Sequence, residues 1–387
     1  MANKPLQIRP RRKIFYGWWI AVAASFQVFW VSGTFMFGFT AFVNPILDEF
    51  GWSTTSIAIA ISIQRTEAGV AGPFVGILID RFGARSVILT GTIVTAIGFF
   101  MLARIDQLID FYIAFAVMAL GVSMGTFIAT TAAVNNWFSK YRSRALAIAF
   151  TGPGLSGIIV PFLVFLIANH GWRTTLDIVG IGTLLVGLPV VFVMRFRPED
   201  YGEVPDGIEA TSNVEFNPEG LEKQNHEEIN LNLRQALRSI AFWQLMLAMG
   251  LTGIAMGTVT VFAIPALESY GLSTTTAGFA VFLLTLVSLS GRWGLGFLGD
   301  VVEKRYVLAL SFLLIALGTL AFALIGTVWH LALFLLLYSP GHGGSIPVRF
   351  ALMGDYFGRK SYGTILGVTM TIGTIFGVAG PVFVGWM

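Results

Sequence analysis

Long apolar stretches alternate with short polar ones along the whole of this sequence. A helix that crosses a bilayer needs about 20 mostly apolar residues. Eleven segments meet that length, at approximately residues 15–43, 54–79, 86–105, 109–134, 144–168, 174–194, 240–267, 274–299, 306–326, 330–353 and 362–387. The pattern therefore predicts an all-α polytopic membrane protein with eleven spans.

One long polar stretch interrupts this series. Segment 196–236 carries Pro, Gly, Asn and many carboxylates, which predicts a solvated linker with a short surface helix at Leu231–Ser239. The chain then divides into an N-terminal bundle of six helices (1–195), a linker (196–238) and a C-terminal bundle of five helices (239–387). The positions of the charges predict that the linker is cytoplasmic, as argued below.

Glycine and proline recur at a fixed spacing of 220 positions. The pairs include Gly33 and Gly253, Pro45 and Pro265, Gly51 and Gly271, Gly98 and Gly318, Gly121 and Gly341, and Pro161 and Pro381. Because these residues punctuate the backbone, the repeat predicts two pseudo-symmetric bundles of one fold. Helix six, at 174–194, would map to 394–414, beyond Met387. We therefore expect the native gene to encode a twelfth span that is missing here.

Composition narrows the possible functions. The chain is 55% hydrophobic, only 12% charged, and contains no cysteine. Its four histidines are scattered and form no metal-ligand spacing. No nucleophile–base pair or phosphate loop is present, so we expect no enzyme, no cofactor, no metal and no nucleic-acid partner. The partners expected are the lipid bilayer and a small solute.

The positive charges lie on one side of the predicted membrane. Of the 24 Lys and Arg residues, nineteen fall in the N-terminal tail, the linker and alternate loops, whereas the opposite loops hold only Arg104 and Arg173. The positive-inside rule then places the N-terminus and the linker in the cytoplasm.

The loop after the second span carries a motif. Gly76, Asp80, Arg81, Gly83 and Arg85 form the pattern G-x-x-x-D-R-x-G-x-R. The pattern resembles the signature loop of the major facilitator superfamily. Its echo lies 220 positions on, with Asp300 and Arg305. Glycine lets helices approach closely, and we expect the charged residues to form a cytoplasmic gate latch.

A narrower resemblance extends along most of the chain. The entry to the fifth span has an aromatic pair, a basic cluster and then glycines: Trp137, Phe138, Lys140, Arg142, Arg144, Gly152, Gly154 and Gly157. This arrangement is similar to that of monocarboxylate porters, in particular the bacterial branch related to oxalate/formate antiporters. The resemblance implies a secondary transporter of a small organic anion, a monomer in the bacterial inner membrane.

Two arginines lie inside predicted spans, where charge is expensive and usually functional. Arg292 is followed four residues later by Gly296, a spacing that resembles the arginine of monocarboxylate porters that binds the substrate carboxylate. Arg65 is predicted near the midplane and is a candidate second anion ligand. The alternative for Arg292 is a structural contact with a helix-end carbonyl or with lipid. The alternative for Arg65 is a contact with Glu67 or with a carbonyl of a neighbouring helix. The repeat maps Arg65 to Thr285 and Arg292 to Gly72, so neither is duplicated.

Glu67 is the carboxylate nearest the middle of a span. Desolvation would favour its protonated form, so it is the candidate for proton coupling. The alternative is a buried ion pair with an arginine of another helix. Because the first span has no lysine and Ser288 stands four residues before Arg292, the proton site of the animal monocarboxylate porters is missing.

Further substrate-binding candidates are polar residues that the repeat does not double. His342 and Tyr338 share a face of the tenth span, and Gln27 lies in the first. Each could instead form a helix–helix hydrogen bond. The sequence thus predicts transport of a small monocarboxylate by alternating access. The alternatives are an inorganic oxyanion or dicarboxylate porter that uses Arg65 with Arg292, and a membrane solute receptor that does not transport.

Overall fold

The computed structural model describes residues 14–207, 230–271, 273–325 and 328–386, and within them every regular element is a helix. The N-terminal bundle contains α1 (Tyr16–Val31), α2 (Thr40–Phe50), α3 (Thr54–Phe82), α4 (Ala84–Leu102), α5 (Leu108–Gly125), α6 (Phe127–Trp137), α7 (Arg142–Ala149), α8 (Thr151–Leu155) and α9 (Ile159–Val193). A short π-helix, Ser32–Met36, follows α1, and a 3-10 turn, Ser156–Ile158, follows α8. The fifth and sixth predicted spans meet at Gly171, whose positive φ of 77° turns the chain inside α9.

The linker begins after α9 with two 3-10 turns, Glu199–Tyr201 and Pro205–Gly207. It ends with α10 (Leu233–Arg238), which begins with a capping box between Asn232 and Gln235. This helix confirms the surface helix expected in that region. The C-terminal bundle contains α11 (Ile240–Ser269), α12 (Thr274–Leu298), α13 (Lys304–Ala323), α14 (Val328–Phe357) and α15 (Tyr362–Trp386).

The predicted spans all correspond to helices. Eight helical segments of the described chain are long and apolar enough to cross a membrane, and one of them, Arg142–Val193, contains both the fifth and the sixth predicted spans. The second and eleventh spans are α3 and α15. Helix α3 is less apolar because it contains Gln64, Arg65 and Glu67. The fold class predicted from the sequence is therefore confirmed.

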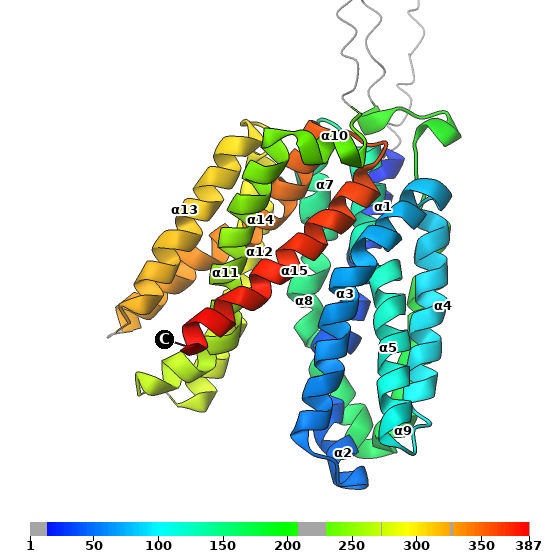
Figure 1. The fold of residues 1–387 in the computed structure, drawn as a ribbon, viewed down its shortest axis with the longest axis vertical. Coiled ribbons are helices and arrows are strands. Elements are labelled where there is room, and N and C mark those ends of the chain that lie inside the picture. The colour runs from blue at the N-terminus through cyan, green and yellow to red at the C-terminus, as the bar shows by residue number, and fades with distance from the viewer. Residues whose placement is uncertain (1–13, 208–229, 272, 326–327, 387) are drawn as a thin grey trace, which may run out of the picture.

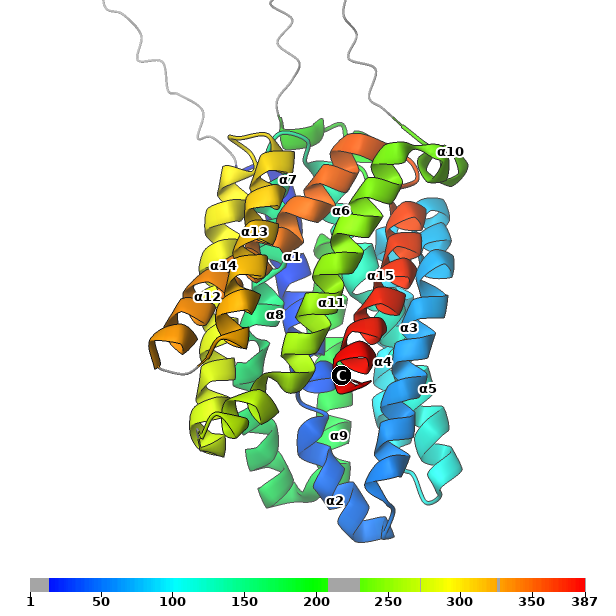
Figure 2. The ribbon, with the colours of Figure 1, turned by 60° about the vertical axis from the view of Figure 1, so that its left-hand side comes forward.

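The two bundles meet at one end and separate toward the other, as Figure 1 shows, and Figure 2 shows α10 at the end where they meet. We call the meeting end, where α10 and the first linker residues lie, the linker end. Helix α15 packs along α3, while α12 and α14 contact α7. Glycines allow this approach: a methyl group on Gly76 would clash with the Gly363 carbonyl oxygen.

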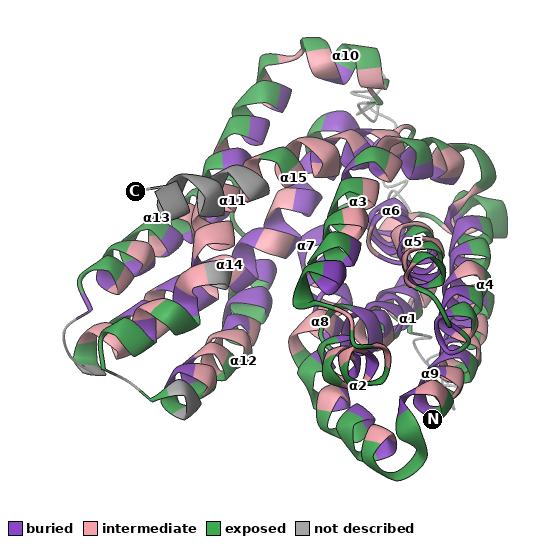
Figure 3. Ribbon diagram, turned by 60° about the horizontal axis from the view of Figure 1, so that its bottom comes forward, coloured by how far each residue is buried: buried purple, intermediate pink, exposed green. Residues whose placement is uncertain are grey.

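Burial follows this arrangement. One hydrophobic cluster joins both bundles near the linker end and includes Trp137, Phe150 and Phe350. Away from it, large apolar residues such as Phe74, Leu185 and Phe192 are exposed. In Figure 3 the exposed residues, in green, lie on the outer sides of the helices. Such faces are expected of a protein whose surroundings are hydrocarbon rather than water.

Candidate functional site: an amide-capped latch and a buried arginine

Two aspartates of the repeated motif join the bundles at the linker end. The Asp80 carboxylate accepts hydrogen bonds from the backbone N–H groups of Gly363 (2.9 Å) and Thr364 (2.8 Å), at the start of α15. The Asp300 carboxylate accepts from Ser143 (2.9 Å) and Arg144 (3.1 Å), at the start of α7. The first N–H groups of a helix lack intrahelical partners and carry partial positive charge. Each carboxylate therefore caps a helix of the opposite bundle.

Two residues of the linker bind the neighbouring amides of the same loops. Asp206 accepts from the backbone N–H groups of Ser139 (2.9 Å) and Lys140 (2.7 Å). Asn230 accepts from those of Arg359 and Lys360, both at 3.1 Å. The donor residues 139 and 140 are related to 359 and 360 by the repeat of 220 positions, so equivalent amides are bound in the two halves. One is made by a charged carboxylate and the other by a neutral amide.

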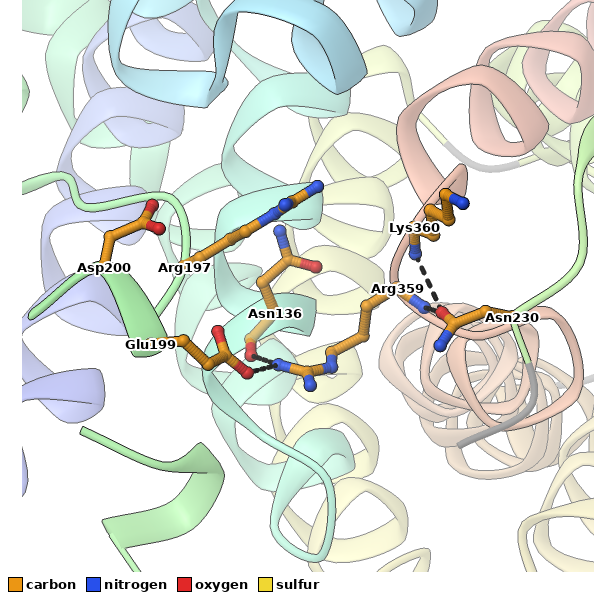
Figure 4. Close-up of a pocket in the computed structure, with 7 residues that line it drawn as sticks. All are labelled: Asn136, Arg197, Glu199, Asp200, Asn230, Arg359 and Lys360. Carbon is orange, nitrogen blue, oxygen red and sulfur yellow. Dashed lines mark hydrogen bonds and ion pairs between the residues drawn. The ribbon is translucent and has the colours of Figure 1, made fainter. Parts of the chain in front are cut away.

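Side-chain ion pairs add to this contact. Asp355 pairs with Arg142 of the other bundle and with Lys304 at 2.8 Å. Arg359 pairs with Glu199 of the linker at 2.8 Å and donates to the Asn136 carbonyl oxygen at 3.0 Å. Figure 4 shows the Arg359 side chain directed between Glu199 and Asn136, within a pocket of about 330 Å³.

Asp300 sits in a buried environment. Its side chain is fully buried and lies 3.2 Å from the Arg144 Nε. Burial raises the pKa of the Asp300 carboxyl to about 6, and the hydrogen bonds from Arg144 and Ser143 and the charges of Lys304 and Arg144 oppose that rise.

We call the contacts of Asp80, Asp300, Asp206 and Asn230 with backbone amides the latch.

The arginines of the motif take no part in the latch. Arg81 lies over the Phe82 ring and Arg85 over the Phe192 ring, both within their own bundle. Arg305 pairs with its neighbour Glu303. Gly83 has a φ of 82°, which ends α3 with a turn that a residue bearing a side chain rarely adopts. The two repeated loops meet at the linker end, where each aspartate binds backbone amides of the opposite bundle and Asp300 also pairs with Arg144.

Arg292 of α12 reaches across to the N-terminal bundle. Its Nη1 donates to the Phe150 carbonyl oxygen at 2.6 Å, and the residue is 6% exposed. Phe150 is the single residue between α7 and α8, so the carbonyl lies where the helix is interrupted. Gly154 leaves room for the guanidinium, since a methyl group there would lie 2.6 Å from Nη1. The Arg292 Nε is buried without a hydrogen-bond partner among the described residues.

Helix α14 brings further polar groups close to Arg292. The Tyr338 and His342 rings are stacked at 5.9 Å, and the buried His342 Nδ1 has no partner among the described residues. Arg349 lies seven residues, about two turns, after His342 on the same face of α14. Arg349 was missed by the sequence analysis, although it is an arginine within the predicted span 330–353 whose repeat partner is Ala129.

Arg65 and Gln27 lie elsewhere. Arg65 is exposed. It lies two turns before Gly72 on the same face of α3, and at Gly72, nearer the linker end, that face contacts α15. Gln27 is buried, and its amide nitrogen donates to the Thr92 hydroxyl (3.3 Å) and the Gly125 carbonyl (3.1 Å) within the N-terminal bundle. Of the expected ligands, the structure therefore brings together Arg292, His342 and Tyr338.

Glu67 is separate from this group. One carboxylate oxygen accepts a hydrogen bond from the Ser123 hydroxyl of α5 at 2.9 Å, and the other is buried without a partner among the described residues. The adjoining groove is apolar, lined by residues such as Val70, Phe74 and Leu120. The alternative role of Glu67 requires an ion pair with an arginine of another helix, and within the described chain Glu67 forms none.

Comparison with known sequences decides the family. Residues 11–381 match the Major Facilitator Superfamily. The chain belongs to this superfamily. It is therefore a membrane-spanning transporter, and the expectation that it is not an enzyme is confirmed by this membership.

Several relatives align over nearly the whole chain. An uncharacterized transporter of this type from Bacillus subtilis is 24% identical, covering 96% of this chain and 87% of the relative. Monocarboxylate transporter 13 of Bos taurus is 25% identical, covering 96% and 83%. Human monocarboxylate transporter 7 is 24% identical, covering 95% and 80%. The predicted resemblance to monocarboxylate transporters is confirmed.

Solved structures share the fold. A crystal structure of the transporter FucP in the outward conformation has a TM-score of 0.71 at 15% identity, covering 96% of this chain and 92% of that one. The human organic anion transporter MFSD10 has a TM-score of 0.64, also at 15% identity, covering 95% and 91%.

Proposed function

We propose that this protein transports a small organic anion and that Arg292 binds a carboxylate of the solute. The observation that carries the proposal is a buried guanidinium with one backbone acceptor and no carboxylate partner among the described residues. A planar guanidinium keeps its charge when buried and matches a carboxylate with two parallel hydrogen bonds. The relatives named as monocarboxylate transporters support a carboxylate as the ligand.

The position of Arg292 also suits alternating access. Its guanidinium spans the contact between α12 of one bundle and the α7–α8 junction of the other. A solute that replaces the Phe150 carbonyl as acceptor would change how tightly the two bundles are held together. Binding would then be coupled to rocking of the bundles about a site between them.

We infer that the linker end faces the cytoplasm, because the loops there hold most of the Lys and Arg residues of the chain. With the latch formed at this end, the structure would be the state that receives solute from outside. Breaking the latch would then open the cytoplasmic end. This assignment predicts that a membrane-impermeant reagent added outside reaches Arg65→Cys but does not reach a cysteine placed in the linker.

We further propose Glu67 as the carrier of a coupled proton. Its contact with Ser123 and an apolar groove, without a cation, favours a carboxyl that exchanges a proton over a structural ion pair. Glu67→Gln mimics the protonated form. It should abolish accumulation driven by a pH gradient while leaving exchange at equal pH intact. A well-folded Glu67→Gln protein that still accumulates solute against a pH gradient would exclude this role.

The experiment that tests the proposed function is a panel of radiolabelled carboxylates in proteoliposomes, with and without a pH gradient. We expect saturable uptake of at least one small carboxylate, and inhibition by its close analogues. Neutral isosteres, such as the corresponding amides, serve as the control and should neither enter nor compete. If amides compete as well as carboxylates, the anion assignment is wrong.

A further inference from the structure

A second arginine in the membrane-spanning region, Arg349 of α14, has no partner that explains it. Its guanidinium carbon lies 4.7 Å from the centroid of the neighbouring Phe350 ring. It forms no hydrogen bond or ion pair with any residue that the structure describes, and its Nε is buried. Arginine cannot lose its charge by deprotonation in a protein. Because an uncompensated charge at this depth is costly, it indicates a ligand rather than a structural role.

Arg349 lies close to the proposed carboxylate site. The Phe350 ring, over which its guanidinium sits, packs against the Phe150 ring at 5.6 Å. The Phe150 carbonyl is the acceptor of Arg292. His342 is seven residues, or about two turns, before Arg349 and therefore on the same face of α14. Arg292 and Arg349 thus both lie beside the contact between Phe150 and Phe350, and His342 stands two turns before Arg349 on the same helix face.

The packing of α12 against α14 gives the separation of the two arginines along the helices. A methyl group on Gly291 would meet the Pro340 carbonyl, and one on Gly344 would lie 2.9 Å from the Gly291 carbonyl oxygen. Arg292 is therefore level with the residues just before Gly344. The backbone of Arg349 lies about six residues farther on, or about 9 Å along the axis at 1.5 Å per residue. Two long side chains of this separation can hold the two ends of one short molecule.

The charges of this region are unbalanced. Within the described chain no carboxylate pairs with Arg292 or Arg349, whereas the loop arginines Arg142, Arg144 and Arg359 all have carboxylate partners. We propose that Arg349 and His342 form a second anion subsite beside Arg292, and that the transported solute is a small dianion, a short dicarboxylate. This inference rests on the proposed function, because it takes Arg292 as the ligand of the first carboxylate.

The charge of the solute then decides how well it fits. A dicarboxylate neutralises both guanidinium groups, and the His342 imidazole can donate a further hydrogen bond to it. A monocarboxylate leaves one buried positive charge without a partner. Since an unpaired buried charge opposes exclusion of water, a monoanion should bind more weakly and should be a poorer substrate.

The test is equilibrium binding to the purified full chain, followed by the fluorescence of its tryptophans. The probes are malonate and succinate as dianions, and acetate and propionate as monoanions, at pH 7.5. We expect the wild-type protein to bind its better dianion at least about tenfold more tightly than either monoanion. Arg349→Gln should abolish this preference, with monoanion affinity changed less than about twofold. Arg349→Lys should restore part of the preference.

Arg65→Gln is the matched control, because Arg65 is an exposed arginine of the other bundle. It should keep the wild-type preference. If Arg65→Gln loses the preference and Arg349→Gln keeps it, the second subsite is at Arg65 and the proposal is wrong. If the wild-type protein binds monoanions as tightly as dianions, the second subsite is also ruled out, and this result does not depend on whether the variants fold. The proposed function would still stand. Binding of none of the four carboxylates would instead contradict the proposed function itself.

Discussion

The contacts at the linker end and the groups around Arg292 differ in how they use the repeat. At the linker end the halves bind equivalent groups: Asp80 caps α15 as Asp300 caps α7, and the amides bound in one half lie 220 positions from those bound in the other. Around Arg292 nothing matches. Arg292, His342 and Arg349 correspond to Gly72, Val122 and Ala129 in the other half.

This difference separates two tasks. A gate that closes two similar bundles against each other is made most simply from the same contact used twice. A solute without that symmetry is best bound by groups that one half alone supplies. We therefore interpret repeated polar residues as the latch and unrepeated ones as the solute site. The predictions below follow from this division.

Replacing both aspartates of the latch should have the largest effect. Asparagine keeps one acceptor oxygen but presents an NH2 group to the second backbone N–H, so each substitution loses one hydrogen bond, about 1 kcal/mol per site. Asp80→Asn with Asp300→Asn should therefore shift the closed–open ratio roughly 30-fold toward an open linker end. The chain has no cysteine, so thiol labelling of Asn135→Cys, which is fully buried beside Gly354, measures the opening. Asp200→Asn, a linker carboxylate outside the latch, is the control. An unchanged labelling rate in the double variant would show that these caps do not hold the bundles together.

Arg292→Lys should reduce transport of the carboxylate at least about tenfold, because an ammonium cannot reproduce the paired hydrogen bonds of a guanidinium. Labelling of Asn135→Cys at the linker end should change little, since the latch remains intact. Initial uptake rates in proteoliposomes give the comparison, with Arg65→Lys alongside. Wild-type uptake of every anionic solute by Arg292→Lys would show that this arginine is structural.

The sequence predicted the fold and the loops of the latch, because both depend on local patterns. Span length, the repeat and the position of Asp80 at a helix end can all be identified along the chain. It did not predict which groups Asp80 and Asp300 bind, since backbone amides leave no signature in a sequence. Asp206 and Asn230 lie in a linker without periodicity and were missed for the same reason.

The solute site was predicted only in part. Arg292 and His342 were identified because they are polar residues inside apolar spans. Arg349 carries the same signal, but it is close to the predicted end of its span, where an arginine commonly extends to the interface. Gln27 carries the signal too, yet its amide bonds Thr92 and Gly125. Whether a polar side chain faces another helix or the solute depends on packing, which the span pattern does not contain.

The latch should respond moderately to pH through Asp300. Its pKa is about 6 in the closed structure, and it should approach the ordinary value near 3.9 when opening exposes it to water. The closed state therefore holds the proton more tightly. This stabilisation is present below about pH 4 and is lost as the pH rises through about 6. Labelling of Asn135→Cys, corrected for thiol ionisation, should slow several-fold from pH 7 to pH 5, and Asp300→Asn should remove that dependence.

The linker contacts should give the smallest effect. Asn230→Asp would make the second cap charged like the first, which should strengthen it by about 1 kcal/mol and slow opening roughly fivefold. Asp206→Asn should have the opposite effect. The rate of thiol labelling of Asn135→Cys measures the opening of both variants. Equal opening rates in the two variants would mean that the linker does not contribute to the latch.

The most direct test of the division between latch and site is to measure carboxylate affinity in two variants side by side. Arg292→Lys should lose at least about tenfold in affinity with the latch intact. The double variant of Asp80→Asn and Asp300→Asn should bind the same carboxylate within about threefold of wild type, although its linker end is open. If the latch variant loses binding and Arg292→Lys retains it, the assignment of repeated residues to the gate and unrepeated residues to the solute is wrong.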